Sequence, residues 1–555
     1  MSTLTYEKAI LRSTSQITDD LIPTARDFLQ SENFKPEEFL GCRKKKVMFV
    51  VPPGSMEVEF GRLATAGAEL PWLGMAYVAA AVRKVGHQVF LRDYEVERAG
   101  WDAVGQDIRG FAPDVISTAG FINNMDRCLK VFEIAKQINP KILTVLGGPQ
   151  ATIFPDDAIQ SMHLDALVIS EAEIAFTRLV SYCEDPEAWH TFKGVVWRHF
   201  QSRELIKNAR QALVQDLDSF PLPALDLYPM TSYYPAVYIW GKKVANMVTS
   251  RGCPYECTFC EAKMTFGRTF RYHSEERVLD DLDFLNKKYG FDSFQFYDDI
   301  FTTNRERVMK LCEYLLKKNR KYKWMCYTRT DRVDLELLKL MKRAGCYMIS
   351  YGVESGDQIL LDKIRKRLNV DANHKGIEAT AKAGIMPVGT FMLGLPGETR
   401  AQTLNTINFA VNSKLDYAIF GITEPYPGTE MWGDALKDGY FIEADETHTN
   451  HLLPNFNKIW VPKDRTRDDL EELTRDAYRK FYVRPKIFMR WLRNFLHIPL
   501  GRTFRYVMSG FNYLIYFPTK DFLGRIFPHF SLAYFSKRNG KKKDPLERHF
   551  GVKYG

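Results

Sequence analysis

Short apolar runs alternate with longer amphipathic stretches throughout the first third of the chain. The runs are bounded by polar residues, glycine or proline, and they span Val47–Val51, Gln88–Leu91, Val115–Thr118, Ile142–Leu146 and Ala166–Ile169. Runs of this length and content are typical of strands buried in a parallel sheet. Since helical stretches separate them, the pattern predicts a doubly wound, Rossmann-like α/β domain over residues 44–185.

A second alternating series predicts another parallel α/β domain over residues 241–440. Its six apolar runs are Val244–Thr249, Ser293–Tyr297, Trp324–Tyr327, Tyr347–Tyr351, Met386–Met392 and Tyr417–Ile422. The rest of the chain lacks this alternation. We expect residues 1–43 to form a helical lead-in, the Pro-containing residues 186–240 to form a linker, and residues 441–555 to form a mainly α-helical region.

The composition is that of a large globular protein with about two to four domains. Of the 555 residues, 45% are hydrophobic and 26% are charged. We find no apolar run long enough to predict a transmembrane helix. Because the N-terminus also lacks the apolar core of a signal peptide, we expect a cytoplasmic protein.

The net charge of +9 is concentrated near the C-terminus, where residues 479–543 contain fifteen Lys or Arg and the single acid Asp521. Apolar and basic residues are interleaved at helical spacing over 484–535, as in a basic amphipathic helix. One interpretation is peripheral contact with the anionic inner face of a membrane. The other is a helical lid that packs on the rest of the protein. Nucleic-acid binding is less favoured.

Three cysteines, Cys253, Cys257 and Cys260, follow the first apolar run of the second domain with the spacing C-x3-C-x2-C. A structural zinc site or an ordinary iron–sulfur site needs four ligands. His273 is the nearest further candidate, but it lies far from Cys260 in sequence. The long chain and its odd total of nine cysteines argue against a disulfide framework. Three ligands would leave one iron of a [4Fe–4S] cluster open to a small molecule.

This spacing, with Phe259 directly before the third cysteine, resembles the signature of the radical S-adenosylmethionine (SAM) superfamily. The resemblance implies a partial (β/α)6 barrel for the second domain. It also implies that the open iron of the [4Fe–4S] cluster chelates the amino and carboxylate groups of SAM, with Phe259 beside the adenine. An electron from a donor such as ferredoxin or flavodoxin then cleaves SAM to a 5′-deoxyadenosyl radical. Such a radical takes hydrogen from unactivated carbon, which no protein acid or base can do.

The same resemblance assigns SAM contacts to the carboxyl ends of the barrel strands, where parallel α/β folds bind ligands. Asp298 and Asp299 would accept hydrogen bonds from the SAM ammonium group, and Arg329 would pair with its carboxylate. The nucleoside would be contacted by the last residues of the fourth and fifth strands, namely Glu354, Ser355, Gly394, Gly397 and Glu398.

The first domain resembles that of the superfamily branch with an N-terminal cobalamin-binding domain. The resemblance rests on two loops, Gly147–Thr152 and Ser170–Glu173, although Gln150 stands where relatives often have histidine. The contacts implied for cobalamin are at Gly147, Gly148, Pro149, Gln150, Ser170 and Glu171. A domain that keeps the fold without binding a corrinoid is the alternative. A nicotinamide-binding domain is disfavoured, because no G-x-G-x-x-G follows the first strand.

Three functions fit these features. The first is cobalamin-dependent C-methylation of a large apolar substrate such as a hopanoid, an isoprenoid lipid or a porphyrin. The second is radical ring formation or oxidative cyclisation without methyl transfer, as in the anaerobic cyclase of bacteriochlorophyll synthesis. The third is tRNA methylthiolation, which would need a second cluster site. Its three candidate ligands, Cys42, Cys128 and Cys183, lie in unsuitable sequence contexts.

Overall fold

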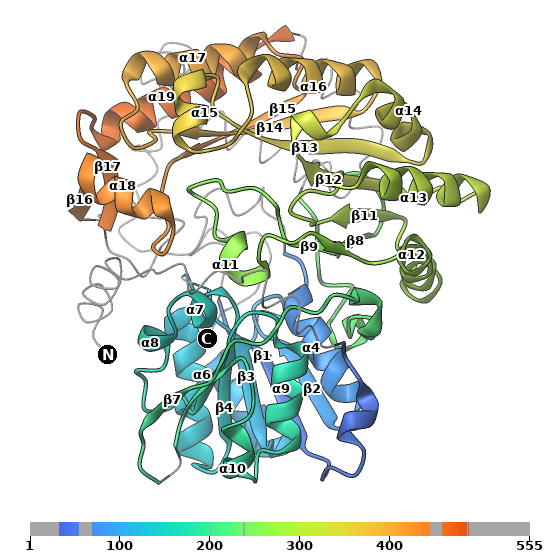
Figure 1. The fold of residues 1–555 in the computed structure, drawn as a ribbon, viewed down its shortest axis with the longest axis vertical. Helices are drawn as coiled ribbons and strands as arrows, with labels where there is room; N and C mark the ends of the chain where they lie inside the picture. The colour runs from blue at the N-terminus through green and yellow to red at the C-terminus, as the bar shows by residue number, and fades with distance from the viewer. Residues whose placement is uncertain are drawn as a thin grey trace, which may run out of the picture.

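The computed structural model describes residues 33–54, 69–121, 123–199, 201–236, 239–443, 458–485 and 487. Two parallel sheets dominate it, one in the N-terminal half and one in the C-terminal half (Figure 1). This confirms the predicted fold class of a Rossmann-like region followed by a radical SAM-type barrel. No helix among the described residues has the length and apolarity needed to cross a membrane.

The N-terminal sheet has the order β2-β1-β3-β4-β5-β6-β7, with β1 to β5 parallel. Its strands are β1 (Lys46–Val51), β2 (Gln88–Asp93), β3 (Val115–Ala119), β4 (Leu143–Gly147), β5 (Ala166–Val168), β6 (Val195–Arg198) and β7 (Leu205–Lys207). Because the order reverses between β1 and β3, a ligand-binding crevice is expected at the carboxyl ends of these two strands.

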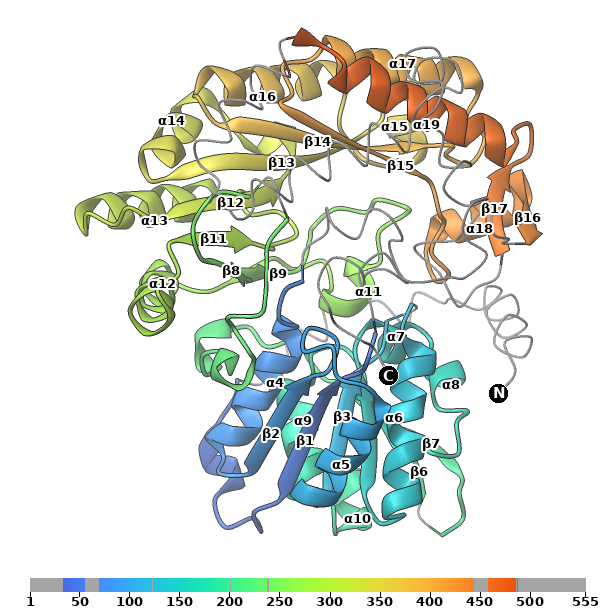
Figure 2. The same ribbon diagram turned by 180° about the vertical axis from the view of Figure 1, so that it is seen from behind.

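Helices cover both faces of this sheet, as Figure 2 shows from behind. They are α4 (Leu73–Lys84), α5 (Trp101–Phe111), α6 (Met125–Ile138), α7 (Pro149–Ile153), α8 (Pro155–Ala158), α9 (Ala172–Ser181) and α10 (Pro186–Trp189). Alternate residues of β1 enter different cores: Phe49 packs with residues of α4 and α9, and Met48 with residues of α5 and α6. The buried run of β1 therefore serves two helical layers, as a doubly wound fold requires.

One prediction for this half was wrong. Residues 186–240 were expected to be an irregular linker, but β6 and β7 lie within that range and extend the sheet in antiparallel fashion. The two strands have only four and three residues, so the apolar signal is weak. Strand β6 pairs with what would otherwise be the open edge of β5, and its Trp197 is buried.

The C-terminal sheet is fully parallel, with the order β15-β14-β13-β12-β11-β8. Its strands are β8 (Val244–Met247), β11 (Ser293–Phe296), β12 (Lys323–Thr328), β13 (Cys346–Glu354), β14 (Met386–Leu393) and β15 (Tyr417–Ile422). These match the six predicted runs. Sequential order with parallel pairing throughout is the arrangement of an open barrel of six β/α units.

Helices surround this sheet, most of them on its outer side and two, at 358–363 and 430–438, at the edge that carries the cysteine loop. They are α12 (Glu275–Tyr289), α13 (Arg305–Lys317), α14 (Leu335–Arg343), α15 (Gln358–Lys363), α16 (Val370–Lys382), α17 (Arg400–Asn412), α18 (Glu430–Asp438) and α19 (Arg467–Tyr482). The last of these lies within the expected C-terminal region, yet it packs on β15, where Tyr478 and Tyr482 bond to strand backbone. It therefore serves as the final helix of the barrel.

Two short ribbons complete the described fold: β9 (Ser250–Arg251) pairs with β10 (Arg271–Tyr272), and β16 (Gly439–Glu443) with β17 (Lys458–Pro462). The latter ribbon lies in the region predicted to be mainly helical. The basic segment 484–535 lies almost wholly outside the described residues, as do residues 1–32 of the expected helical lead-in.

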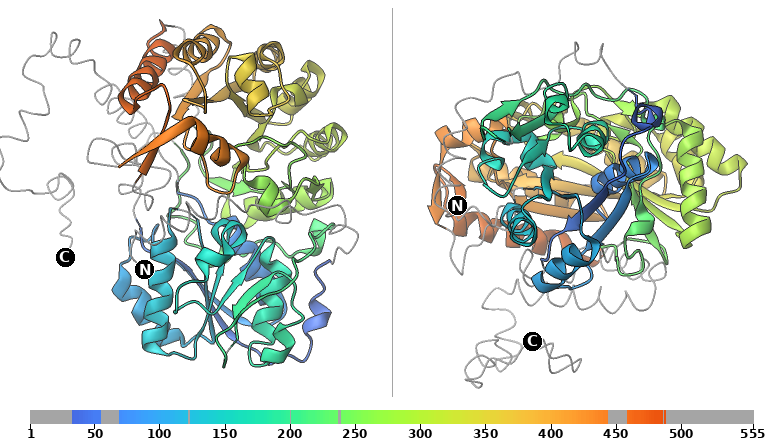
Figure 3. Two further views of the ribbon diagram at one scale, coloured as in Figure 1. Left: turned by 60° about the vertical axis from the view of Figure 1, so that its left-hand side comes forward. Right: turned by 90° about the horizontal axis from the view of Figure 1, so that it is seen from below.

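The two halves face each other across α11 (Ala262–Phe266), and the N-terminal half covers one end of the barrel (Figures 1 and 3). Helix α7, which follows β4, contacts α11, and Met264 of α11 packs against Ile153 and Phe154. The carboxyl ends of both parallel sheets are thus directed toward the same interface, where ligands bind in such folds.

Candidate active site between the two sheets

The cysteine-bearing loop begins directly after β9, at a glycine that no other residue can replace without strain. Gly252 has φ +86°, and a Cβ there would lie 2.3 Å from the carbonyl oxygen of Thr269. The loop then runs through Cys253, Cys257 and Cys260 to α11. The backbone N–H of Cys260 donates to the carbonyl of Cys257 at 3.3 Å.

The three thiols have the donor chemistry that an iron–sulfur cluster needs. Burial raises the pKa of Cys253 to about 11 and that of Cys260 to about 12, while the N–H groups of Tyr255 and Ala262 donate to their sulfurs. Without iron, the Cys253 and Cys260 thiols are therefore protonated at neutral pH, and iron binding must release their protons. Within the described ranges, no three His, Cys, Asp or Glu side chains are grouped as metal ligands.

The middle of the loop is held by the barrel. The N–H of Thr258 donates to the carbonyl of Ile364 at 3.1 Å, and the carbonyl of Thr258 accepts from the N–H of Met431 at 2.9 Å. Phe259 is half-buried against an apolar cluster at the same edge, which includes Leu360, Leu361, Ile364, Leu395 and Met431. These contacts fix the backbone on both sides of Cys257.

The two adjacent aspartates after β11 play different parts. Asp298 is buried, and its carboxylate accepts hydrogen bonds from the Thr249 N–H, the Thr249 hydroxyl and the Ser250 hydroxyl, each at 2.6 Å. Its main role in this structure is thus to hold the start of the cysteine loop. Asp299 is exposed as a residue and accepts from the Gly252 N–H, so it is the more accessible carboxylate. Desolvation of its carboxyl group and the neighbouring Asp298 raise its pKa to about 6.

Replacing Asp298 with alanine should destabilise the protein strongly. The change leaves one backbone N–H and two hydroxyls without their buried acceptor, which costs about 2–4 kcal/mol of unfolding free energy in comparable cases. Chemical denaturation of the variant measures this loss. Replacement of the exposed Asp299 by alanine serves as the control and should change the unfolding free energy by less than about 0.5 kcal/mol.

Arg329 was predicted to pair with the SAM carboxylate, but the structure engages it elsewhere. Its guanidinium donates to both carboxylate oxygens of Asp331, at 2.9 and 3.1 Å, and to the carbonyls of Lys366 and Arg367, at 2.7 and 3.0 Å. It also lies 3.8 Å from the ring centroid of Tyr255. Arg329 therefore anchors residues 366–367 and the cysteine loop.

A second buried cation, which the sequence analysis missed, also lies beside the cysteine loop. Lys366 is 7% exposed, and its Nζ donates to Glu354 at 2.8 Å. The same Nζ is 5.7 Å from the ring centroid of Phe259. The Cys257 thiol is among the groups that, together with Glu354, raise the pKa of Lys366 against the opposing effect of burial. Lys366 is therefore a charged group beside the loop.

Glu354 adopts a backbone conformation that reflects its special position. It has φ +66°, unusual for a residue other than glycine, and the register of β13 with β14 shifts between Gly352 and Glu354. A Cβ on Gly352 would lie 2.5 Å from a Glu354 carboxylate oxygen and 3.0 Å from Lys366 Nζ. The irregular strand end and the missing side chain together make room for the ion pair.

The other residues predicted to contact the nucleoside make contacts within the protein itself. Ser355 is fully buried and bonds to the hydroxyl of Thr406 at 2.9 Å. Gly394 faces Leu470 of α19, 2.9 Å from where a Cβ would lie, and Gly397 lies close to Lys363. Glu398 is buried and accepts from the Leu395 N–H at 2.6 Å. Their backbones lie at the carboxyl edge of the sheet. The Ser355 hydroxyl is already bonded within the fold, whereas Glu398 Oε1 has no hydrogen-bond partner among the described residues.

In the N-terminal half, the loop after β4 is shaped by glycine. Gly148 has φ +92°, and a Cβ there would lie 2.8 Å from the carbonyl oxygen of Gly120. It follows Gly147, the last residue of β4, and precedes Pro149 at the start of α7. Gln150 is buried, and its N–H donates to the Gly120 carbonyl at 3.0 Å. A backbone this close to a strand end can contact a ligand directly.

Glu171 was predicted to contact cobalamin, but it is used in an ion-pair network between the two halves. Its carboxylate pairs with Arg271 at 2.8 Å and with Arg251 at 3.2 Å, and it accepts from the Val214 N–H at 3.0 Å. Burial opposes ionisation, yet the two guanidiniums lower the pKa of Glu171. Ser170 just before it has φ +65° and donates its hydroxyl to the Thr265 carbonyl of α11 at 2.8 Å.

The barrel is closed at its base and open toward this interface. The base is filled by side chains from five strands that form one apolar cluster, including Val244, Met325, Met348, Val388 and Tyr417. Further along the strands, the same alternation brings Tyr297, Tyr327, Met392 and Ile419 to the inner face. Tyr297 is 40% exposed and Ile419 41% exposed, so the upper lumen is accessible. By the same alternation Gln295, Ser350 and Thr390 also face it, so its lining combines aromatic, apolar and polar side chains.

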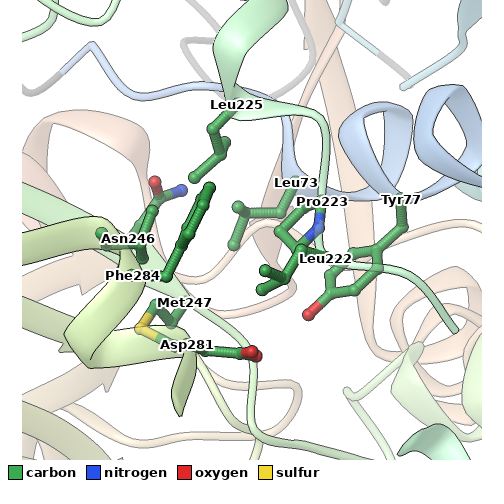
Figure 4. A pocket seen from close by; sticks show the side chains of 10 residues that line it. Leu73, Tyr77, Leu222, Pro223, Leu225, Asn246, Met247, Asp281 and Phe284 are labelled. Carbon is green, nitrogen blue, oxygen red and sulfur yellow. The ribbon is translucent and has the colours of Figure 1, made fainter. Parts of the chain in front are cut away.

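A small cavity between α4 and the first barrel strand is a packing gap. It is lined mainly by apolar side chains, among them Leu73, Tyr77, Leu225 and Phe284 (Figure 4), and has room for about one water molecule. It is too small for an organic substrate, so the open end of the barrel is the better candidate for that role.

A six-stranded parallel barrel with a three-cysteine loop at its carboxyl edge, covered by a Rossmann-like domain, defines an enzyme with an open-sided iron–sulfur site. Family models agree with this: residues 247–410 match the radical SAM superfamily and residues 61–180 match the B12 binding domain. The chain belongs to the cobalamin-binding branch of the radical SAM superfamily. Its cofactors are a [4Fe–4S] cluster, SAM and cobalamin.

Curated relatives include an uncharacterized methyltransferase of Pyrococcus horikoshii, 30% identical over 80% of this chain and 94% of its own length. The cytidylyl-2-hydroxyethylphosphonate methyltransferase of Streptomyces wedmorensis is 26% identical over 74% of this chain and 86% of its own. The anaerobic magnesium-protoporphyrin IX monomethyl ester cyclase of Cereibacter sphaeroides is 27% identical over 79% of this chain and 74% of its own.

Solved structures show the same fold. One is a radical S-adenosylmethionine methyltransferase, TsrM, from Kitasatospora setae, with cobalamin and a [4Fe–4S] cluster bound. It has a TM-score of 0.61 and 13% sequence identity, and the likeness covers 80% of this chain and 90% of that one. The likeness supports the described fold of a Rossmann-like domain followed by a parallel β/α barrel.

Proposed function

We propose that this protein is a cobalamin-dependent radical SAM C-methyltransferase that acts on a large apolar substrate. The observation that supports it best is the accessible upper lumen of the barrel, which presents Tyr297, Met392 and Ile419 and opens toward the loops of the B12-binding domain. When bound, the cofactors supply a radical able to take hydrogen from unactivated carbon and a carrier for a methyl group. The protein's own part is to hold the substrate carbon between them and to exclude water.

Aromatic side chains at the crevice of the N-terminal sheet also support this proposal. Trp72 precedes α4 and Phe121 follows β3, so both lie at the point where the strand order reverses. Their rings meet edge to face with centroids 5.3 Å apart, and Phe121 is 38% exposed. An accessible aromatic pair at this point suits the broad apolar face of a corrin ring.

For SAM itself, we propose a contact set that differs from the one expected from the sequence. Asp299 is the accessible carboxylate beside the cysteine loop and suits the ammonium group. Lys366, rather than Arg329, is the cation that suits the carboxylate, and its partner Glu354 suits the ribose hydroxyls. Phe259 would then pack beside the adenine, on the side where Lys366 lies.

A radical cyclase or oxidative enzyme is the second candidate, because the cyclase of Cereibacter sphaeroides matches most of this chain. Incubating the reconstituted enzyme with a reductant, a total lipid extract and SAM carrying a deuterated methyl group separates the two. A methyltransferase places the labelled methyl group in an extractable product. Product formation without label would contradict methyl transfer and favour the second candidate.

Filling the upper lumen should separate substrate modification from SAM cleavage. Replacing Ile419 with tryptophan places a bulky ring on the inner face of β15, so we expect product formation to fall at least about tenfold. Reductive cleavage of SAM without substrate should stay close to that of wild type. The control is Ile359 replaced by tryptophan, since Ile359 is 71% exposed on α15. Equal product formation by both variants would contradict substrate binding in the lumen.

An apolar substrate would come from a membrane or a carrier. We propose that the enzyme works in the cytoplasm at the inner membrane face and takes electrons from ferredoxin or flavodoxin. The basic and aromatic sequence of 484–535 supports the membrane contact. Binding of the full chain to anionic vesicles, lost at high salt, would test it. Absence of binding at low salt would contradict it.

A further inference from the structure

Four buried charges from the two halves of the protein meet beside the cysteine loop. We call Glu171, Glu173, Arg251 and Arg271 the interdomain charge cluster. Arg251 pairs with Glu173 at 2.6 Å and with Glu171 at 3.2 Å, and Arg271 pairs with Glu171 at 2.8 Å. The four side chains are only 2–7% exposed. Two positive and two negative charges therefore neutralise one another, and all four side chains are shielded from water.

The ribbon that starts the cysteine loop depends on this balance. Arg251 of β9 lies directly opposite Arg271 of β10 in the antiparallel register, and like charges in such positions repel. The ion pairs described for these two arginines all involve Glu171 and Glu173, which belong to the other half of the protein. Since Cys253 is two residues after Arg251, the N-terminal half stabilises the point at which the cysteine loop begins.

Glu171 is also linked to the loop that follows β4. Ser170, next to Glu171, donates its N–H to the Thr152 hydroxyl at 2.9 Å, and that hydroxyl donates to the Gly148 carbonyl at 3.0 Å. The Ser170 hydroxyl donates to the Thr265 carbonyl of α11 at 2.8 Å. A continuous set of hydrogen bonds and ion pairs thus joins the loop after β4 to both ends of the cysteine loop.

Stability alone does not explain why charges occupy this interface. Removing ionic groups from water costs free energy that their mutual attraction often only offsets, so apolar residues would hold the two halves together equally well. Charged pairs differ in that they are directional: Arg251 is further enclosed by the rings of Tyr77 and Phe220, at 5.2 and 5.3 Å. Such an arrangement favours one position of the cysteine loop relative to the loop that carries Glu171.

We propose that the interdomain charge cluster couples the two cofactor sites, so that a filled cysteine loop strengthens cobalamin binding. Iron held by Cys253 would restrain Arg251, which lies two residues before it in β9. Through its ion pair with Glu171, Arg251 would in turn restrain the loop after β5 and the hydrogen-bonded loop after β4. By linkage, bound cobalamin must strengthen binding of the iron–sulfur cluster by the same factor. This inference rests on the proposed function, because it requires both cofactors to bind.

Cobalamin binding to two forms of the full-length protein tests the coupling. Hydroxocobalamin is titrated by absorbance into protein reconstituted with iron and sulfide and into protein without the cluster. We expect wild type to bind at least about fivefold more tightly when the cluster is present. In the Glu171→Gln, Glu173→Gln double variant this ratio should fall to near one. The single Glu173→Gln variant, which removes only the pair with Arg251, should give an intermediate ratio.

Asp165→Asn is the matched control, because Asp165 is a buried carboxylate paired with Lys136 within the N-terminal domain, at 2.5 Å. It should lower the unfolding temperature but keep the wild-type ratio. Hydrogen exchange of the cofactor-free proteins gives an independent readout. Residues 148–154 and 251–262 should both exchange faster in the double variant and not in Asp165→Asn.

Two results would overturn the coupling: a wild-type ratio of one, or a double variant that keeps the full ratio. A wild-type protein that binds no cobalamin would instead contradict the proposed function. In that case hydrogen exchange tests the coupling. If residues 251–262 exchanged at the wild-type rate in the double variant, the coupling would be overturned as well.

Discussion

Replacing Cys257 with alanine abolishes both cluster assembly and reductive SAM cleavage, if the three-cysteine loop is the iron–sulfur site. With two thiolates left, the loop cannot supply the three ligands that hold the cluster while leaving one iron open. Cys257 is the most deeply buried of the three, and its neighbour Thr258 is bonded on both sides to the barrel. Iron and sulfide content after reconstitution, together with 5′-deoxyadenosine formed from SAM, measures the loss.

Cys42 replaced by alanine is the matched control for this experiment. It is a free cysteine before β1, distant in sequence from the loop, and its removal should leave iron content and SAM cleavage unchanged. A Cys257→Ala protein that still forms 5′-deoxyadenosine at the wild-type rate would show that the cluster is held elsewhere.

Replacing Lys366 with methionine should weaken SAM binding by about ten- to a hundredfold. The change removes the buried cation beside the loop and leaves the Glu354 carboxylate without its partner at 2.8 Å, so a negative charge would face the SAM carboxylate. Methionine keeps most of the side-chain volume. Equilibrium dialysis of SAM against cluster-loaded protein gives the dissociation constant without any turnover.

Two further variants separate a role in SAM binding from a structural role. Lys363→Met removes an exposed lysine from the same segment, where it pairs with Asp438 at 3.2 Å, and should not change SAM affinity. Arg329→Met should mainly lower the unfolding temperature, because Arg329 anchors residues 366–367 and Tyr255. If Arg329→Met lost SAM affinity at full stability while Lys366→Met retained it, the expected assignment of Arg329 would be right.

The strands and the cysteine loop could be predicted because each has a local signal. Buried parallel strands are short apolar runs, and the cluster ligands lie within eight residues of sequence. Strands β6 and β7 lack such a signal, because each has only three or four residues and one polar or charged end. They are defined by pairing with β5, which is a tertiary contact.

The side-chain roles were harder to predict because they depend on contacts distant in sequence. Asp298 and Asp299 are identical neighbours, and only the fold shows that one is bonded to β8–β9 residues while the other is exposed. Glu171 has a ligand-like position after β5, but its partners Arg251 and Arg271 lie about eighty and a hundred residues away. Lys366 is part of a basic run, a pattern that usually marks a solvated surface.

The central claim is that this enzyme methylates an apolar molecule at unactivated carbon. It is tested most directly by mass analysis of total lipid and pigment extracts from a deletion strain and from the same strain complemented with wild type or Cys257→Ala. The account predicts that the deletion strain loses a species heavier by one CH2 and accumulates its lighter precursor, and that only the wild-type gene restores it. The claim would be contradicted if the deletion strain lost no species for which a precursor lighter by one CH2 accumulated.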